Sequence, residues 1–286
     1  MLRKVLKHDL NAVWRPWVIL SISALLLSVV GGLSLRSLIT YDNSSGFFAY
    51  WMPFAAMTLG ISVMGIIAYN VAELIIVAVK YYQSFFTDVG YLTFTLPVKR
   101  HTLFNSKLLT NFIISFSSTV VTVIGIIIML LITPANVDGS GILLATVWEY
   151  FVLIFVDLFA IPEGWFAAYF IVAILIAIAY YIVFANLIIY MCITVASTLV
   201  KKAKLLLAFG IYYAVNSVMS IVSYFCSWLA NVIISCLIDG FPGASAHLIM
   251  TITLLMLLIV LMAIIVLSVT LYRFSLSRIE KNLNLA

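Results

Sequence analysis

The side chains that could do chemistry are few and widely separated. The three histidines, His8, His101 and His247, fall in different segments, without carboxylates at the spacing of a catalytic motif. No glycine is followed by lysine, so the chain has no phosphate-binding P-loop, and HExxH and GxSxG sequences are also absent. The three cysteines match no zinc or redox spacing. The sequence therefore predicts no catalytic residues, no metal site and no enzyme activity in this chain.

One carboxylate, Glu73, lies inside an apolar run that is long enough to cross a bilayer. An ionisable group inside a span is a functional candidate by default. The alternative, which we favour, is a carboxylate at the membrane boundary that reaches the headgroups or pairs with Lys80, seven residues further on. The apolar runs also contain uncharged amides that indicate interhelical hydrogen bonds or, as an alternative, a substrate path: Asn70, Asn111, Asn186, Asn216 and Asn231.

The composition sets the class of protein that must position these side chains. Hydrophobic residues make up 65% and charged residues 9% of the 286 residues, and the mean hydropathy is +1.24, whereas soluble domains are about 25% charged. The sequence therefore predicts an all-α, polytopic membrane protein with a single transmembrane domain over residues 1–286. The net charge of +5 follows membrane topology, so we expect no nucleic-acid partner.

Six apolar runs have the length of a membrane-spanning helix, which needs about 20 residues. An amphipathic segment at residues 1–15 precedes them, and we expect it to lie on the headgroups as an interfacial helix. Pro16 is expected to separate this helix from the first span, because proline breaks the helical hydrogen-bond pattern. The predicted spans are residues 17–35, 52–79, 108–132, 165–199, 205–238 and 248–272.

Residues 142–161 have the length of a further span but contain Glu149 and Asp157, eight residues apart on one helical face. A span at this position would bury two carboxylates and would move every later loop to the other side of the membrane. A helix on the outer surface leaves both carboxylates in water. We therefore predict an extracellular surface helix, with partial or complete insertion as the alternative.

The basic residues predict the orientation of the chain. With the amino terminus in the cytoplasm, fourteen of the fifteen lysines and arginines fall on the inner side, and only Arg36 falls outside. This asymmetry follows the positive-inside rule, so both termini are expected in the cytoplasm. The residues predicted to mark the cytoplasmic boundary around the second and third spans are Glu73, Lys80, Lys99, Arg100 and Lys107.

Residues 80–107 interrupt the apolar pattern between the second and third spans. Their apolar side chains recur every three or four positions and form one stripe of a helix, which Pro97 ends. Tyr91 and Phe94 project from the opposite, polar face. Two aromatic side chains on that face indicate contact with another protein, and an ordinary interfacial loop is the alternative.

From Phe86 to Leu109 the sequence FTDVGYLTFTLPVKRHTLFNSKLL resembles the segment after the second span in permease subunits of bacterial ABC-2 type ABC transporters. Outside residues 86–109 the similarity is one of layout, with six spans, a surface helix between the third and fourth spans and a basic tail. The resemblance rests on Asp88, Gly90, Tyr91, Leu92, Thr95, Leu96, Pro97, Arg100, Leu103, Ser106 and Lys107.

The resemblance implies that residues 88–96 form a cytoplasmic coupling helix that sits in a groove of an ATPase subunit. Two copies of this ABC ATPase would bind ATP and Mg²⁺, and this chain would hold no cofactor of its own. A second permease subunit would complete a homodimer or heterodimer in the bilayer of the bacterial cell membrane. The implied docking residues are Asp88, Gly90, Tyr91, Leu92, Phe94, Thr95, Leu96 and Pro97.

The function implied by the resemblance is export by alternating access, with ATP hydrolysed by the partner. Family analogy allows peptides such as lantibiotics, drugs, lipids or ions as cargo. Two other interpretations stay open. A non-transporting accessory or sensor protein would have the same hydropathy, and a membrane-embedded enzyme would need clustered ionisable residues, which the sequence lacks.

Overall fold

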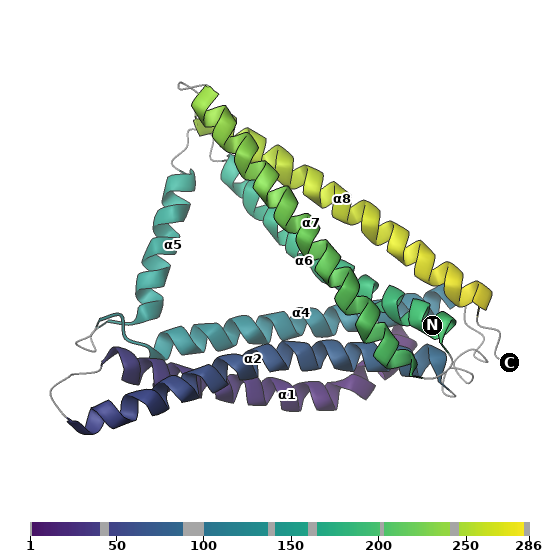
Figure 1. Ribbon diagram of the computed structural model, residues 1–286, viewed down its shortest axis with the longest axis horizontal. Coiled ribbons are helices and arrows are strands. Elements are labelled where there is room, and N and C mark those ends of the chain that lie inside the picture. The colour runs from purple at the N-terminus through teal and green to yellow at the C-terminus, as the bar shows by residue number, and fades with distance from the viewer. Residues whose placement is uncertain are drawn as a thin grey trace. The chain divides into compact units, whose positions relative to one another are not determined.

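The computed structural model describes the chain in seven segments, and each of them is dominated by one helix (Figure 1). The described residues are 2–40, 46–87, 100–136, 141–159, 165–200, 203–240 and 246–282. The helices are α1 (Leu2–Ile39), α2 (Gly46–Phe86), α4 (Arg100–Ile132), α5 (Leu143–Phe159), α6 (Trp165–Leu199), α7 (Lys204–Gly240) and α8 (Ala246–Asn282).

Six of these helices are long and apolar enough to cross a membrane, namely α1, α2, α4, α6, α7 and α8. The prediction of an all-α chain with six apolar helices of membrane length is therefore confirmed. The chain thus has the layout of a multi-pass membrane protein. The seventh helix, α5, has 17 residues within the described part of the chain and is not among the six helices of membrane length.

α5 occupies most of the predicted surface helix at residues 142–161. It is anchored at its start, where the Leu143 backbone N–H donates to the Thr133 carbonyl oxygen at 2.9 Å. Glu149 is exposed, and the side chain of Asp157 lies outside the described residues. The helix is present, and its place on the outer surface stays a prediction.

α1 differs from the prediction of a separate interfacial helix at residues 1–15. It runs without interruption from Leu2 to Ile39 and contains Pro16, so the predicted break at Pro16 is wrong. Proline removes one backbone hydrogen bond, but it does not end α1 here. Val13 is buried, and the Trp17 indole N–H donates to Ser118 Oγ at 2.9 Å.

Contacts between residues divide the chain into two compact units. The first contains Met1–Val77 and Leu109–Ala167, and the second contains Ala78–Leu108 and Ala168–Ala286. The end of α2 and the start of α4 therefore belong with α7, α8 and nearly all of α6. The prediction of a single transmembrane domain stays a prediction.

In the first unit, α1, α2 and α4 lie side by side (Figure 1). Small residues allow this close approach: a Cβ on Gly32 would lie 3.2 Å from the Met129 backbone oxygen, and one on Gly125 would lie 2.5 Å from Ser28 Oγ. Ser28 and Gly32 therefore form a small-residue contact of α1 with α4.

Hydrogen bonds between side chains connect the same three helices. Each such bond in a membrane protein contributes on average about 0.6 kcal/mol, so the set adds to the packing without dominating it. The pairs are Trp17 with Ser118 at 2.9 Å, Ser21 with Tyr69 at 3.1 Å, Ser34 with Thr58 at 2.7 Å and Thr122 with Asn70 at 3.3 Å.

In the second unit, a core of Phe184, Ile188 and Cys192 on α6 packs against α7 and α8. The partly buried side chains around it come from both helices: Ile211, Tyr212, Val215, Met219, Ile264 and Leu271. Cys192 is buried and forms no disulfide. It acts as a small apolar side chain in this core.

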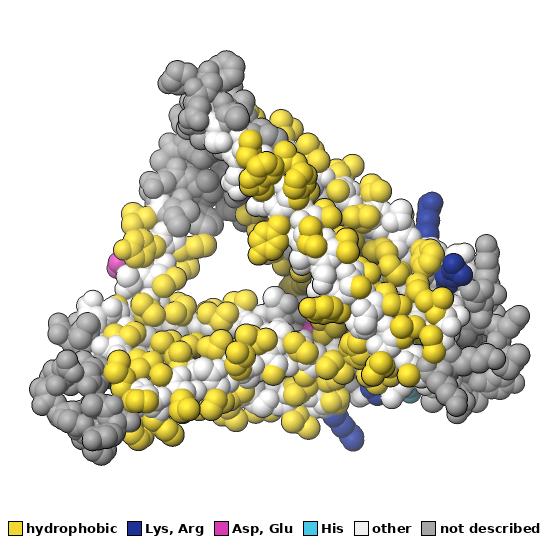
Figure 2. All heavy atoms as spheres, in the orientation of Figure 1, with side chains coloured by type: hydrophobic (Ala, Val, Ile, Leu, Met, Phe, Trp, Pro, Cys, Tyr) yellow, Lys and Arg dark blue, Asp and Glu magenta, His cyan; other side chains and the backbone are white. Residues whose placement is uncertain are grey.

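Large apolar side chains cover much of the outer surface. Figure 2 shows them over α1, α2 and α4 and over α7 and α8. On α7, Leu206, Tyr213 and Tyr224 are each more than three-quarters exposed. Apolar patches of this extent are unusual on soluble monomers and are expected of helices whose solvent is lipid.

Candidate functional site

The predicted coupling helix lies between α2, which ends at Phe86, and α4, which begins at Arg100. Residues 88–99 are outside the described part of the chain, so its docking role stays a prediction. Its two flanks, residues 78–87 and 100–108, are described and belong to one unit. The predicted docking residues outside the description are Asp88, Gly90, Tyr91, Leu92, Phe94, Thr95, Leu96 and Pro97.

An aromatic cluster joins the two flanks to α6 and α8. We call Tyr81, Phe85, Phe104, Tyr190 and Tyr272 the flank cluster. Two of its members come from the end of α2, one from the start of α4, one from α6 and one from α8. All five lie in the second unit, and all but Tyr272 are almost fully buried.

The tightest contact of the flank cluster joins α2 to α6. The rings of Tyr81 and Tyr190 are stacked, with centroids 3.8 Å apart and an interplanar angle of 9°. The hydroxyls of Tyr81 and Thr194 are hydrogen-bonded at 3.1 Å, and Thr194 Oγ1 also donates to the Tyr190 carbonyl oxygen at 2.7 Å. The buried phenol thus has both ring contacts and a polar partner, which fixes its orientation.

A second set of contacts brings the start of α4 into the cluster. Phe104 packs edge-on against Tyr190, with centroids 5.6 Å apart, and against Tyr272 of α8, with centroids 5.3 Å apart. The Tyr272 hydroxyl donates to Asn105 Oδ1 at 2.7 Å. Edge-to-face geometry at these distances is favourable for aromatic pairs, so these contacts hold α4, α6 and α8 together around Phe104.

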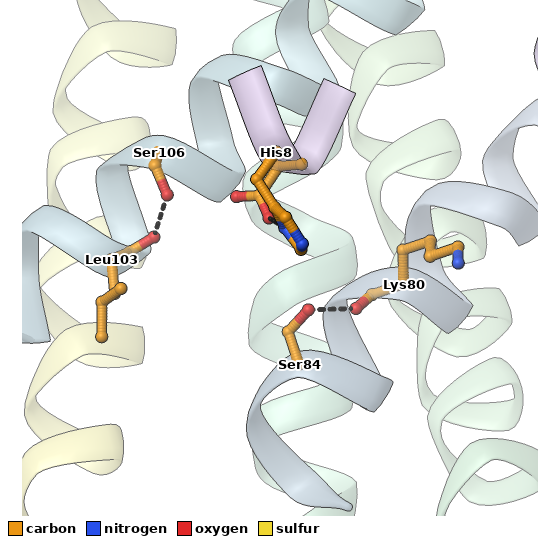
Figure 3. Close-up of polar contacts among 6 residues, drawn as sticks. His8, Lys80, Ser84, Leu103 and Ser106 are labelled. Carbon is orange, nitrogen blue, oxygen red and sulfur yellow. Dashed lines mark hydrogen bonds and ion pairs between the residues drawn. The ribbon is translucent and has the colours of Figure 1, made fainter. Parts of the chain in front are cut away.

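The helix ends that carry the cluster are well formed. Phe85 is fully buried and its ring lies 5.2 Å from that of Tyr81, one helical turn earlier. Figure 3 shows a serine hydroxyl bonded to its own helix on each flank: Ser84 Oγ donates to the Lys80 carbonyl oxygen at 2.7 Å, and Ser106 Oγ donates to that of Leu103 at 2.9 Å. The flanks are therefore helical up to Phe86 on α2 and from Arg100 on α4.

The basic residues predicted at the membrane boundary surround this cluster in the sequence. Lys80 and Lys107 are partly exposed on α2 and α4, and Arg100 is the first residue of α4. The side chain of Arg100 and all of Lys99 lie outside the description. Their role as boundary residues stays a prediction.

Glu73 has a different partner from the one that the sequence suggested. Ser115 Oγ of α4 donates to Glu73 Oε1 at 2.8 Å. The ion pairs between described residues include His8 with Asp9, at 3.9 Å, but none between Glu73 and Lys80. One turn away, Asn70 Oδ1 accepts a bond from Thr122. Glu73 is thus part of the polar contact between α2 and α4 in the first unit.

The chemistry available at the flank cluster is that of packed rings and neutral hydrogen bonds. Its members carry no carboxylate, thiol or basic group, and the described residues contain no group of three or more His, Cys, Asp or Glu side chains that could hold a metal ion. This arrangement suits the positioning of helices. It offers no nucleophile paired with a base.

Sequence reasoning missed the flank cluster. The only local signal is the pair Tyr81 and Phe85, four residues apart, which places both rings on one helical face. Nothing in the sequence indicates that Tyr190 and Tyr272 meet them. Comparison of the chain with models of known protein families, with curated proteins and with solved structures finds no match in any of the three.

Proposed function

We propose that this chain is the permease subunit of a bacterial ABC-2 type exporter, driven by ATP that a separate ATPase subunit hydrolyses. The observation that carries the proposal is the resemblance of residues 86–109 to the coupling segment of such permeases. This segment joins α2 to α4, two of the six helices of membrane length, as the proposed role requires.

Two further features support the proposal. The flanks of residues 88–99 are packed into the second unit by the flank cluster, so a partner bound there would have a rigid attachment to α6 and α8. In addition, the proposed orientation places fourteen of the fifteen lysines and arginines, including those around residues 80–107, on the side where ATP is found.

The proposed mechanism divides the work between subunits. Two ATPase copies bind ATP and Mg²⁺ and close on each other, and each moves one coupling helix, at residues 88–96, of a permease dimer. The permease helices then alternate between an inward-open and an outward-open state and release cargo outside. This chain forms no covalent intermediate. Its contribution is the contact with the ATPase and the helices that respond to it.

The docking contact predicts the effect of removing its aromatic side chains. Tyr91→Ala combined with Phe94→Ala is expected to reduce co-purification of the ATPase subunit about tenfold or more, because aromatic anchors commonly contribute 2 kcal/mol or more each to such contacts. The measurement is the ratio of ATPase to permease recovered from membranes that contain both chains.

The matched control is Tyr213→Ala combined with Phe225→Ala, which removes the same two ring types from exposed positions of α7. This control is expected to leave the recovered ratio unchanged. Equal recovery of the ATPase with the Tyr91 and Phe94 double variant would overturn the docking assignment. Absence of an ATPase partner for the unaltered chain would favour the accessory or sensor interpretation.

The proposed orientation predicts which loops a membrane-impermeant thiol reagent reaches. In a variant without Cys192, Cys226 and Cys236, Ser140→Cys is expected to react in intact cells, and Ala203→Cys only after the cells are opened. The measurement is the mass shift of the labelled chain. Reaction of position 203 from outside, or of position 140 only from inside, would contradict six spans with cytoplasmic termini.

A further inference from the structure

The two flanks of residues 88–99 group with the C-terminal helices and not with the remainder of their own helices. Residues 78–87 and 100–108 belong to the second unit, whereas most of α2 and α4 belongs to the first. The division falls at Val77 on one helix and at Leu108 on the other. The flanks are therefore packed as a pair with the C-terminal helices.

Tyr190 of α6 is the residue that both flanks contact. Tyr81 stacks on its ring from α2, and Phe104 packs against its edge from α4. Tyr81, Phe104 and Tyr190 are 1%, 0% and 0% exposed, respectively. Close-packed interiors resist continuous deformation, so a displacement of either flank must separate these rings or carry α6 along with it.

Tyr272 gives α8 the corresponding link. Its ring contacts Phe104, and its hydroxyl donates to Oδ1 of Asn105, the residue that follows Phe104 in α4. A ring contact resists separation, and a hydrogen bond of 2.7 Å is in addition directional. The start of α4 is thus attached to α6 through Tyr190 and to α8 through Tyr272.

We propose that the flank cluster transmits movement of residues 88–99 to α6 and α8, with Tyr190 as the positioning residue that both flanks share. This inference rests on the proposed function, in which an ATPase moves those residues. It assigns a separate step, because in the proposed function residues 88–97 contact the ATPase, whereas the flank cluster lies in the described helices α2, α4, α6 and α8. The physical link is a continuous set of packed rings rather than nearness alone.

The test uses the complex of the permease with its ATPase in lipid nanodiscs. Tyr190→Leu removes the ring contacts to both flanks and keeps an apolar side chain in their place. We expect the ATPase to co-purify as with the unaltered chain. The part of ATP hydrolysis that depends on the permease, here called coupled hydrolysis, is expected to fall about five- to tenfold, which corresponds to the loss of one or two aromatic contacts. Tyr190→Phe keeps the ring and is expected to retain most of the activity of the unaltered chain.

Two controls separate transmission from a loss of stability. Tyr212→Leu removes a partly buried tyrosine that packs against the core of Phe184, Ile188 and Cys192, so it is expected to lower thermal stability and leave coupled hydrolysis intact. Tyr272→Phe deletes only the hydroxyl bonded to Asn105 and is expected to lower coupled hydrolysis about two- to fivefold, whereas Tyr213→Phe on exposed α7 is expected to have no effect.

The outcomes distinguish this inference from the function on which it rests. Normal co-purification with unchanged coupled hydrolysis in Tyr190→Leu would overturn transmission through the flank cluster and leave the proposed function standing. An equal loss of coupled hydrolysis in Tyr190→Leu and Tyr212→Leu would mean that the flank cluster only stabilises the fold. If no ATPase co-purifies with the unaltered chain, the proposed function and the inference are both wrong.

Discussion

Replacing Tyr81 with alanine is expected to lower the free energy of unfolding by about 2–4 kcal/mol, among the largest effects of any single substitution in the second unit. Tyr81 is 1% exposed, stacks on Tyr190 at 3.8 Å and is hydrogen-bonded to Thr194. In lipid the apolar transfer term between helices is small, so the expected loss comes from the packing and the hydrogen bond. Thermal unfolding in detergent, followed by the exposure of buried thiols such as that of Cys192, measures it.

Two companion variants divide this loss into its parts. Tyr81→Phe keeps the stacked ring and removes only the bond to Thr194, so a loss of about 0.5–1.5 kcal/mol is expected. Tyr213→Ala removes the same side chain from a position of α7 that is 77% exposed, and its expected effect is within about 0.5 kcal/mol. If Tyr213→Ala destabilised the protein as much as Tyr81→Ala, the stacked pair would not be a principal contact of this unit.

The helices themselves could be predicted from the sequence because their length and composition leave few alternatives in a bilayer. The fourth predicted span, residues 165–199, coincides with α6, since its apolar run is interrupted by no charged residue or proline. The predicted break at Pro16 was wrong because the prediction considered only the hydrogen bond that proline removes within its own helix. One contact of α1 next to Pro16 is the bond from Trp17 to Ser118, which is 101 positions away in the sequence.

The partners of each helix could not be predicted in the same way. In soluble proteins an apolar stripe indicates the buried face of a helix, but here lipid-facing and protein-facing positions are equally apolar. Tyr190, which is fully buried, and Tyr181, which is 63% exposed, stand in the same apolar run of α6. The sequence therefore predicted the helix and not the side of it that meets Tyr81 and Phe104.

The partner of Glu73 also could not be predicted from the residues near it in the sequence. Its position in an apolar run could be seen in the sequence, and Lys80, seven residues further on, was the nearest basic residue in the chain. The partner in the structure is Ser115 on another helix, a neutral side chain that no charge pattern indicates. The predicted docking residues 88–97 rest on the resemblance alone, and the structure describes only the two flanks of this segment.

Gly32→Val is expected to destabilise the first unit by about 1–3 kcal/mol, because no space exists for its side chain. A Cβ at this position would lie 3.1 Å from Ile132 Cβ, 3.2 Å from Met129 Cα and 3.2 Å from the Met129 backbone oxygen. Two of these three neighbours are backbone atoms of α4, which cannot rotate away. Relief of the overlap must therefore separate α1 from α4 around Gly32 and Met129.

Gly60→Val is the matched control for this prediction. It introduces the same β-branched side chain into a membrane-length helix, but a Cβ on Gly60 meets no atom within 4 Å. The change in helix propensity is the same at both positions, so the difference between the two variants isolates the contact of α1 with α4. Thermal unfolding is expected to show a lower midpoint for Gly32→Val only. Equal midpoints would mean that α1 does not approach α4 as closely as the glycine allows, and that the small residues Ser28 and Gly32 have no packing role.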